Sequence, residues 1–420
     1  MNYQEALSWI CGLSSLQFDK GVERVQWLLD ELGNPEGVCP TVHFVGTNGK
    51  GSTLNALGAI FTAAGYRVGC FTSPSISDYR EQIVCGGERI SEEVFAQLLT
   101  ELRPLVDRLP RETDLSSATE FEVLVVAMLV YMARVARPDI LLVEAGLGGE
   151  RDATAVVQPL ALVCPSIGLD HQEFLGEGHA AIARQKVGAL KPGIPLVYAT
   201  DLPAVEAVFR VHAEQLSSPV YALGQEIALL RQPQGLALST PVGGLDALQL
   251  RMLGRHQETN AALAATTALL LRSRFPDLTE VAIREGLALA HWPGRQELLA
   301  PHLLIDGAHN CESIAVLCET LRTYFPDREV HCLFAAIGTK PVAAMLEELA
   351  ETCAKVAVTT FSDPRAVALR DYPTVYPRVV SYTDWLDQAL ADSTSNRLYL
   401  VTGSLYFIRL VRRYSLYNVK

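Results

Sequence analysis

The stretch that decides the fold is Val42-His43-Phe44-Val45-Gly46-Thr47-Asn48-Gly49-Lys50-Gly51-Ser52-Thr53. A short apolar run leads into a glycine-rich loop, which a lysine and hydroxyl residues follow as a helical pattern begins. Glycines let backbone N–H groups turn toward an anion, the helix N-terminus adds positive potential, and a hydroxyl can ligate Mg²⁺. The segment therefore predicts a phosphate-binding loop in which Lys50 reaches the outer phosphates.

This loop differs from the standard P-loop pattern at two positions. Phe44 stands where that pattern has its first glycine, and Gly51 separates Lys50 from the first hydroxyl residue. An ordinary glycine-rich turn between a strand and a helix is the alternative interpretation. Nucleotide binding is favoured because Lys50 and Ser52 fall where a nucleotide needs them.

Composition argues against several classes of protein. The chain has 420 residues, enough for two or three domains that each bury a core. Its net charge of -12 argues against sequence-independent binding to nucleic acid. Nine cysteines without a C-x-x-C pair indicate neither a disulfide framework nor a zinc site. We recognise no signal peptide, and the longest apolar run, 123–133, predicts a buried helix too short to cross a bilayer. We expect a cytoplasmic protein.

Apolar runs alternate with helical stretches through the first part of the chain. Continuous rather than alternating hydrophobicity predicts strands that are buried on both faces of a parallel sheet. These strands are expected at 42–46, 67–72, 139–145, 160–167 and 195–200. Helical spacing is found in 2–32 and 260–271, whereas the Pro- and Gly-punctuated segment 216–250 predicts small antiparallel strands.

A second rhythm of strands and helices follows residues 292–297, which have the composition of a linker. Its strands are expected near 302–306, 329–336, 355–361 and 398–402. The predicted fold class is α/β: a P-loop ATPase domain with a parallel sheet and a small antiparallel subregion, followed by a smaller Rossmann-like domain. We expect the first domain to span residues 1–294 and the second to span residues 295–420.

Three side chains of the first predicted domain are candidates for chemistry. Glu144 ends a buried run, where a carboxylate faces the ligand crevice of a parallel sheet, and Mg²⁺ prefers such oxygen ligands. A surface carboxylate is the alternative. His171 follows another strand end and is either a ligand or a structural histidine. Lys186 lies among Ala, Val and Gly on a predicted helix, and it is either functional or solvated.

The second predicted domain also has polar side chains just after a predicted strand. Asp306 and His309 follow the strand at 302–306, and they offer a carboxylate and an imidazole where a second ligand wall is expected. Arg295 lies in the linker, where it either meets an anion or is an ordinary surface arginine.

Taken together, these segments resemble the folylpolyglutamate synthase and dihydrofolate synthase family of the Mur ligase superfamily, whose form of the phosphate loop is Gly-Thr-Asn-Gly-Lys-Gly-Ser. The resemblance covers essentially the whole chain and keeps the family's order. Its further motifs are Gly21–Arg24, Ser73-Pro74, Tyr79–Glu81, Phe121-Glu122, Glu144–Gly149, Asp152–Thr154, Leu169–His171, Lys186, Gly254–Gln257, Asn260–Ala262, Pro293–Arg295, Asp306–Asn310, Pro364–Ala366 and Gly403–Tyr406.

The resemblance implies a set of site residues. Those that would contact ATP are Thr47, Asn48, Gly49, Lys50, Gly51, Ser52, Thr53, Asn260, Arg295, Asp306 and His309. Those that would hold Mg²⁺ are Ser52, Glu144 and His171, and a monovalent cation is a further candidate. Lys186 would be carbamylated and would act in catalysis with Lys50 and His309. Those that would lie near the acceptor or the incoming glutamate are Ser73, Phe121, Asp152, His309 and Ser404.

The sequence departs from the family pattern mainly on the acceptor side. Ser75 replaces a histidine, Glu150 replaces an arginine, Ala155 replaces an asparagine and Pro341 replaces an aspartate of that pattern. The positions implied for nucleotide and metal are intact. We therefore predict weaker use of standard folates than is typical of the family, because a donor is lost and Glu150 adds a negative charge.

The predicted function is an ATP-dependent amide ligase that adds L-glutamate to a folate or dihydropteroate carboxylate through an acyl phosphate. One alternative is a superfamily ligase that joins an amino acid to a non-folate acid. The other is a nucleotide-binding homologue that has lost catalysis. We expect small-molecule partners only, with no nucleic acid and no membrane, and a monomer.

Overall fold

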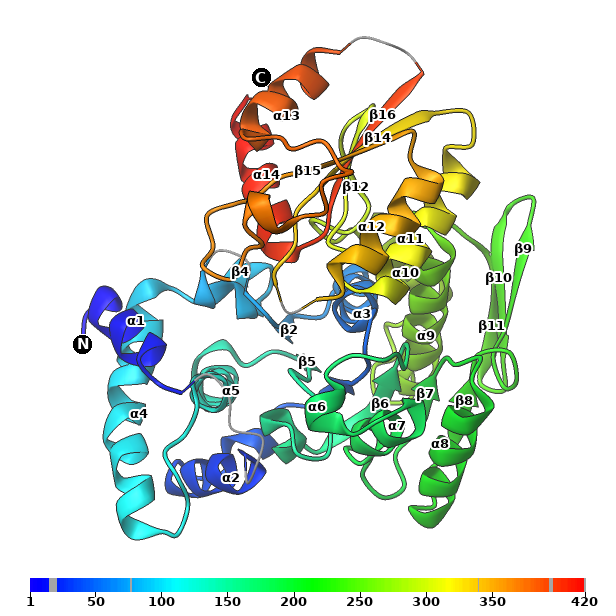
Figure 1. Ribbon diagram of the computed structural model, residues 1–420. Coiled ribbons are helices and arrows are strands. Elements are labelled where there is room, and N and C mark those ends of the chain that lie inside the picture. The colour runs from blue at the N-terminus through cyan, green and yellow to red at the C-terminus, as the bar shows by residue number, and fades with distance from the viewer. Residues whose placement is uncertain (15–20, 76–77, 339, 393–395, 419–420) are drawn as a thin grey trace. The chain divides into compact units, whose positions relative to one another are not determined.

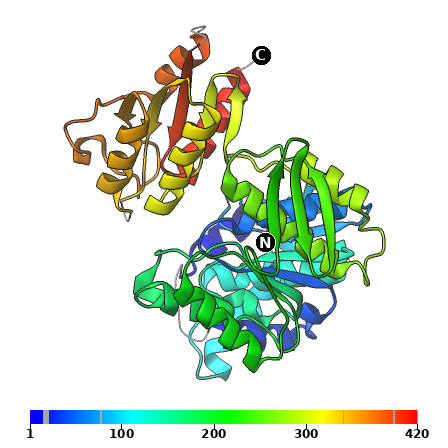
Figure 2. The same cartoon turned by 90° about the vertical axis from the view of Figure 1, so that its right-hand side faces the viewer.

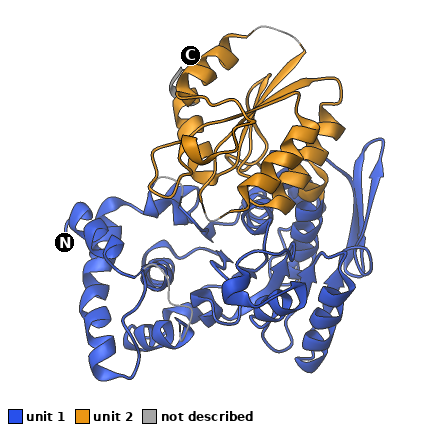
Figure 3. Ribbon diagram, in the orientation of Figure 1, with its two compact units in different colours: residues 1–250, 259–290 blue, residues 251–258, 291–420 orange. Residues whose placement is uncertain are grey.

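The computed structural model describes residues 1–14, 21–75, 78–338, 340–392 and 396–418 of the chain (Figure 1). Figure 3 shows the two compact units into which the chain folds. One consists of Met1–Leu250 and Thr259–Ala290, and the other of Arg251–Glu258 and His291–Lys420. The predicted α/β class is confirmed, whereas the assignment of residues 1–294 and 295–420 as functional domains stays a prediction.

An eight-stranded sheet forms the centre of the first unit. Its strand order is β4-β3-β2-β5-β1-β6-β7-β8, and the strands from β2 to β8 in this order run parallel. The strands are β1 (Thr41–Phe44), β2 (Val68–Phe71), β3 (Ile83–Cys85), β4 (Glu88–Arg89), β5 (Ile140–Glu144), β6 (Pro159–Cys164), β7 (Leu196–Tyr198) and β8 (Val220–Ala222). All residues of β1 and β5 are buried, as continuous hydrophobicity predicts for central parallel strands.

Helices cover this sheet. They are α1 (Tyr3–Cys11), α2 (Gly21–Glu31), α3 (Lys50–Ala63), α4 (Glu92–Glu112), α5 (Glu120–Tyr131), α6 (Gln172–Leu175), α7 (His179–Val187), α8 (Pro203–Gln215), α9 (Arg255–Leu271) and α10 (Glu280–Leu289). Short turns of 3₁₀ or π helix are η1 (Pro35–Gly37), η2 (Tyr79–Gln82), η3 (Met132–Ala136) and η4 (Ala153–Val156). The helical prediction for 2–32 is confirmed for α1 and α2, while residues 15–20 lie outside the described part.

The apolar run 123–133 forms most of α5, and the prediction of a buried helix is confirmed. Thr119 and Glu122 form a capping box at its start, which satisfies two backbone N–H groups. Residues 123–130 are all buried in one cluster with α2 and α4. None of the described helices combines the length and the apolar character that a membrane-spanning segment requires.

A small antiparallel sheet accounts for most of the segment 216–250. Its strands are β9 (Ala228–Gln232), β10 (Gly235–Thr240) and β11 (Gly243–Leu248), which Figure 2 shows side by side. Leu238 and Leu245 join a hydrophobic cluster with Ala264 and Ala265 of α9. The antiparallel prediction is wrong for Val220–Ala222, because this short strand pairs in parallel with β7 at the edge of the main sheet.

The second unit has a five-stranded sheet of order β12-β13-β16-β14-β15. Its strands are β12 (Glu297–Ala300), β13 (Leu303–Ile305), β14 (Glu329–Phe334), β15 (Lys355–Val358) and β16 (Arg397–Thr402). Only β12 runs antiparallel within the described sheet. Its helices are α11 (Cys311–Tyr324), α12 (Val342–Thr352), α13 (Tyr382–Ala391) and α14 (Leu405–Asn418), with the turn η5 (Leu369–Asp371). The predicted linker 292–297 thus runs directly into an unpredicted strand.

Candidate active site

The phosphate loop lies at the carboxyl end of the central strand β1. In the sheet β1 has β5 on one side and β6 on the other. After β1 the chain continues to β2, on the β5 side, whereas after β5 it continues to β6, on the opposite side of β1. Ligands of open α/β sheets bind where the strand order reverses in this way. Helix α3 begins at Lys50 and has no acidic residue in its first turn, so its N-terminus is suited to an anion.

Two glycines give the loop its path. Gly46 and Gly49 have φ values of 140° and 86°, which residues with a β-carbon adopt only with strain. A β-carbon at Gly49 would lie 2.7 Å from Oδ1 of Asn260 on α9. The hydroxyl of Thr53 also donates to that oxygen at 3.1 Å. The structure therefore brings Asn260, a predicted nucleotide residue 211 positions after Gly49 in the chain, against the loop.

The segment after β6 fastens the loop from its other side. The N–H of Thr47 donates to the carbonyl of Ser166 at 2.9 Å, and the N–H of Asn48 donates to the Ser166 hydroxyl at 2.9 Å. The Thr47 hydroxyl accepts from the N–H of Gly168 at 2.9 Å. Sequence reasoning did not identify Ser166 as part of the site, although it lies in the strand end that pointed to His171.

Lys50 and Glu144 lie together at the carboxyl ends of β1 and β5. Lys50 Nζ donates to the carbonyls of Gly46 at 3.0 Å and Thr47 at 3.4 Å, and it lies 3.9 Å from Glu144 Oε1. The other carboxylate oxygen of Glu144 accepts from the N–H of Ser73 at 3.3 Å. The lysine predicted to bind phosphate, the carboxylate predicted to bind a cation and the predicted acceptor segment therefore meet at one edge of the sheet.

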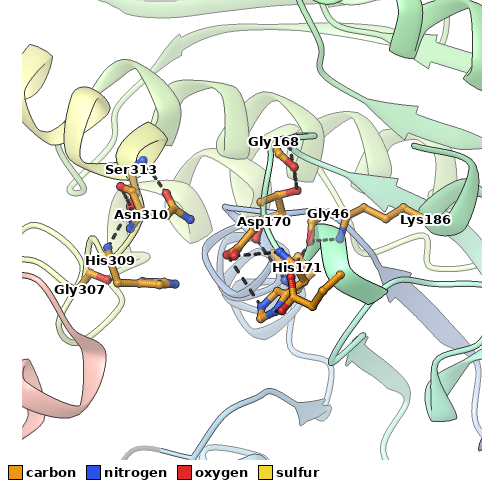
Figure 4. A network of polar contacts seen from close by, with 12 residues as sticks. Gly46, Gly168, Asp170, His171, Lys186, Gly307, His309, Asn310 and Ser313 are labelled. Carbon is orange, nitrogen blue, oxygen red and sulfur yellow. Dashed lines mark hydrogen bonds and ion pairs between the residues drawn. The ribbon is translucent and has the colours of Figure 1, made fainter. Parts of the chain in front are cut away.

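Lys186 is buried beside the phosphate loop. Its side chain extends from α7 and donates to the carbonyl of Gly46 at 2.9 Å (Figure 4). Burial, with the positive charge of Lys50 nearby, lowers the pKa of Lys186 to about 7. A large fraction of this amine is therefore neutral at neutral pH, which is the form that reacts with an electrophile such as CO₂.

Asp152 shapes the glycine-rich loop that packs against Lys186. Its carboxylate accepts from the N–H of Leu147 at 2.7 Å and from the N–H of Thr154 at 2.9 Å. Burial raises its pKa. A β-carbon on Gly149 would lie 2.4 Å from the carbonyl oxygen of Lys186, so only glycine allows this close approach. The structure gives Asp152 this supporting role, and substrate contact by Asp152 stays a prediction.

Phe121 lies next to the end of β5. A β-carbon on Gly146 would come within 2.6 Å of the Phe121 ring, and the ring centroid of Phe121 is 5.9 Å from that of Phe71. The aromatic ring and Ser73 thus flank the segment that follows Glu144. This placement suits an acceptor that stacks on an aromatic surface.

His171 is placed less firmly than the other predicted metal residues. It has a φ of 54°, its side chain is 45% exposed, and its ring nitrogens lie 3.9 Å from carboxylate oxygens of Asp170 and Glu173. In the described residues there is no group of three or more His, Cys, Asp or Glu side chains arranged to hold a metal ion. The oxygen atoms of Ser52 and Glu144 have the donor chemistry that Mg²⁺ prefers, so the metal set stays a prediction based on those two residues and His171.

In the second unit the predicted residues follow the carboxyl ends of parallel strands. Asp306 follows β13 and Ser404 follows β16, which pair in parallel. The buried carboxylate of Asp306 accepts from the N–H groups of Gln296 at 2.9 Å and Ala308 at 2.8 Å. Burial raises the pKa of Asp306, and the nearby Arg295 opposes this rise.

His309 has a defined tautomer when it is neutral. Its Nδ1 lies 2.8 Å from the carbonyl of Gly307. Figure 4 shows these two residues as sticks. A carbonyl only accepts, so Nδ1 carries the hydrogen and Nε2 is the basic nitrogen. The hydroxyl of Ser313 accepts from the N–H of His309 at 3.0 Å, and Asn310 caps α11. Sequence reasoning missed this supporting role of Ser313, which only the capping pattern of the helix indicates.

Comparison with known proteins gives the same family for the chain as a whole. Residues 294–405 match the family described as Mur ligase, glutamate ligase domain. The dihydrofolate synthase/folylpolyglutamate synthase of Bacillus subtilis (strain 168) is 34% identical over 424 residues, which cover 98% of each protein.

Solved structures that resemble the chain belong to the same family of enzymes. The Mycobacterium tuberculosis folylpolyglutamate synthase complexed with ADP has a TM-score of 0.87 at 28% identity and covers 98% of each chain. An FPGS–AMPPCP–folate complex has a TM-score of 0.83 at 29% identity, covering 98% of this chain and 99% of that one. Because a relative that matches over 98% of both proteins is 34% identical, the chain belongs to the folylpolyglutamate synthase and dihydrofolate synthase family of Mur-type ligases.

Proposed function

We propose that this protein is an ATP-dependent ligase that joins L-glutamate to the carboxylate of a folate or dihydropteroate acceptor. The observation that carries the proposal is the arrangement of Lys50, 3.9 Å from Glu144, on a phosphate loop whose Gly46 carbonyl binds the buried Lys186. The names of its relatives support the same activity, since they are folylpolyglutamate and dihydrofolate synthases. A relative's complex with AMPPCP and folate supports ATP and a folate as ligands.

In the first step, an acceptor carboxylate oxygen attacks the γ-phosphorus of ATP, and the bond to the β-phosphate oxygen breaks to release ADP. Lys50 and the N–H groups at the start of α3 stabilise the charge that develops on the transferred group. Ser52, Glu144 and His171 would hold Mg²⁺. When bound, this ion would neutralise phosphate charge. The product is a mixed anhydride of the acceptor and phosphate.

In the second step, the free α-amino group of glutamate attacks the activated carbonyl. The C–N bond forms, the C–O bond to phosphate breaks, and inorganic phosphate leaves. The attacking nitrogen must lose a proton, and His309 Nε2, the acceptor nitrogen of the neutral ring, would take it. Ser404, at the end of β16, and His309 would lie near the glutamate.

Lys186 would enter this mechanism as a carbamate. Its neutral amine would form a bond to the carbon of CO₂ and release one proton to water, which converts a potential cation into an anion. The lowered pKa of about 7 supports this reaction, because the ammonium form cannot react. The resulting anion would lie beside the phosphate loop, where a second cation could be bound.

A non-folate acid is the second candidate acceptor. Ser75, Glu150 and Ala155 differ from the family pattern on the acceptor side. The side-chain carbons of Glu150 pack over Gly188, where a β-carbon would lie 2.6 Å from the Glu150 β-carbon. Loss of catalysis is disfavoured because Lys50, Glu144, His171 and Lys186 are all present. Cytoplasmic location and a monomeric state stay predictions.

The test is a screen for ATP-dependent phosphate release with purified protein. Glutamate is paired in turn with dihydropteroate, tetrahydrofolate and unrelated carboxylic acids, with omission of glutamate as the control. We expect release that requires both glutamate and one of the two pterin acids. Release with an unrelated acid alone would favour the non-folate ligase, and no release with any acid would contradict the proposed activity.

A further inference from the structure

Three segments that are far apart in the sequence meet around one side chain of the second unit. Gln296 precedes β12, His256 lies in the first turn of α9, and Thr320 lies on α11. Gln296 Nε2 is 3.2 Å from Thr320 Oγ1 and 3.5 Å from His256 Nε2. We name Gln296, His256 and Thr320 the Gln296 cluster. Gln296 and Thr320 are buried, with 6% and 3% of their surface exposed, and His256 is partly buried.

The backbone of Gln296 is held as firmly as its side chain. Its φ of 46° lies in the left-handed region, which a residue with a β-carbon adopts at a cost. Its N–H donates to Asp306 Oδ2 at 2.9 Å, and the N–H of Gly307 donates to the carbonyl of Gly294 at 2.9 Å. The loop that carries Arg295 is therefore hydrogen-bonded to the loop that carries Asp306.

The hydrogen bonds of the Gln296 cluster show that it is not optimised for stability. Thr320 Oγ1 donates to the carbonyl of Val316 at 2.9 Å, so it accepts from the Gln296 amide. Gln296 Oε1 and His256 Nδ1 are buried and have no hydrogen-bond partner among the described residues. An apolar side chain of similar length would fill the same space without burying a polar atom that lacks a hydrogen bond. Packing alone therefore does not explain a glutamine at this position.

The charges around the Gln296 cluster are those of the expected nucleotide site. Burial, with Arg295 nearby, lowers the pKa of His256 to about 4, so the ring is neutral at neutral pH. Arg295 also acts on the buried carboxylate of Asp306. The cluster thus adjoins Arg295 in the chain and is hydrogen-bonded to Asp306 through the N–H of Gln296.

We propose that Gln296 is a positioning residue for the nucleotide, anchored by His256 and Thr320 so that Arg295 and Asp306 keep one fixed arrangement. This inference rests on the proposed function, in which Arg295, Asp306 and Asn260 contact ATP. Gln296 itself does not need to touch the nucleotide. Its side chain fixes the left-handed turn, its N–H fixes one oxygen of Asp306, and the turn fixes where the Arg295 side chain starts.

The experiment measures the dissociation constant of AMPPCP for the full-length chain by calorimetry, together with Tm in the absence of ligand. Gln296→Met keeps the side-chain length and removes its polar atoms. Thr320→Val keeps the shape of Thr320 and removes the acceptor of the Gln296 amide. Gln249→Met is the control, since the Gln249 amide bonds the carbonyl of Gln234 at 2.6 Å in the small antiparallel sheet of the first unit.

We expect Gln296→Met to weaken AMPPCP binding about tenfold, because small displacements of positioning groups are costly, without lowering Tm. Thr320→Val should weaken binding roughly threefold, as expected for one lost hydrogen bond. The double variant should resemble Gln296→Met within about twofold, because both changes break one contact. In turnover assays the KM for ATP should rise while the KM for glutamate stays unchanged.

Two results would overturn the inference. One is unchanged AMPPCP binding in both variants, and the other is a loss of binding that merely follows a fall in Tm. If Gln296→Met does not fold, Thr320→Val and its KM for ATP decide the question alone. Failure of the unmodified protein to bind AMPPCP would instead contradict the proposed function, so the two failures are distinguishable.

Discussion

The two regions expected to contact ATP are built in different ways. The phosphate loop of the first unit is one continuous stretch, 42–53, whose shape comes from its own glycines and from a helix that starts at Lys50. The region around Arg295 and Asp306 in the second unit is assembled from segments near residues 256, 296, 306 and 320. A continuous site can be read from sequence, whereas an assembled site depends on side chains that only tertiary structure brings together.

The largest effect is expected for Lys50→Ala in the continuous region. Lys50 is not part of a hydrophobic core, and among the described residues its ammonium bonds carbonyls of the loop and lies near Glu144. Its removal should leave the fold intact and lower kcat by about 10³-fold, the effect of losing a central transition-state charge. Steady-state phosphate release measures the rate, and circular dichroism checks the fold. Near-normal turnover would show that the loop is not the phosphate site.

Lys186→Ala tests whether the phosphate loop also depends on a residue outside its own continuous stretch, since Lys186 packs on the loop from α7. We expect a loss on the order of 10²-fold, as for residues that support a metal or phosphate site, with partial recovery when a short carboxylate is added. Lys191→Ala is the control, because Lys191 Nζ bonds the carbonyl of Ala155 instead. Equal losses in both variants would contradict a specific role for Lys186.

The same lysine gives a prediction for pH. Its pKa is lowered to about 7 in the folded protein, below the ordinary value of 10.5. The carbamate signal of Lys186 in ¹³C NMR with labelled bicarbonate should therefore rise as pH increases through about 7, not near 10.5. The unfolded chain binds more protons between these two values, so the contribution of Lys186 to stability also rises with pH in that window. A carbamate signal absent at pH 8 would contradict the proposed modification.

A matched pair of glycines tests whether the loop shape or the contact with Asn260 matters. Gly49 and Gly65 have φ values of 86° and 85°, but a β-carbon at Gly65 meets no atom within 4 Å. Alanine should cost about 1 kcal/mol of stability at either position, because both backbones are left-handed. Only Gly49→Ala should also weaken ATP binding, by about tenfold, since its β-carbon would lie 2.7 Å from Asn260 Oδ1. Equal KM values for ATP in the two variants would contradict this account.

The smallest effect concerns the acceptor side. Ser75→His together with Glu150→Arg should raise folate-dependent turnover only a few-fold, roughly what one hydrogen bond contributes. Glu150 is exposed, so solvent screens the effect of its charge on an acceptor. The measurement is kcat/KM with tetrahydrofolate, with kcat/KM for ATP as the control. Ordinary efficiency in the unmodified protein would show that these departures are neutral.

The sequence predicted most elements of both sheets because buried parallel strands are continuous apolar runs. It also singled out the loop 42–53, Glu144 and Lys186 from local motifs; the structure brings them together, and their roles stay predictions. It missed the β3–β4 hairpin, although Gly86-Gly87 is a turn signal between two short strands. The parallel pairing of β8 and the contacts of Ser166 were not predictable, because each depends on partners that tertiary folding selects.

Gln296 shows most clearly which residues could not be predicted from the sequence. Nothing in the segment 292–297 distinguishes a buried glutamine from a solvated linker residue. Its importance emerges only when Asp306, Thr320 and His256 are seen around it. Side chains that position other side chains have no sequence motif of their own. The sequence therefore indicated Asp306 and His309 in the second region, but not the residues that hold them in place.

The central claim, ligation through an acyl phosphate at the phosphate loop, is tested most directly by following oxygen during turnover. The acceptor folate is labelled with ¹⁸O in its reacting carboxylate and incubated with ATP, Mg²⁺, glutamate and the protein. The account predicts that the released inorganic phosphate carries one ¹⁸O atom derived from the acceptor in each turnover, while ADP carries none. Amide product accompanied by unlabelled phosphate would contradict it.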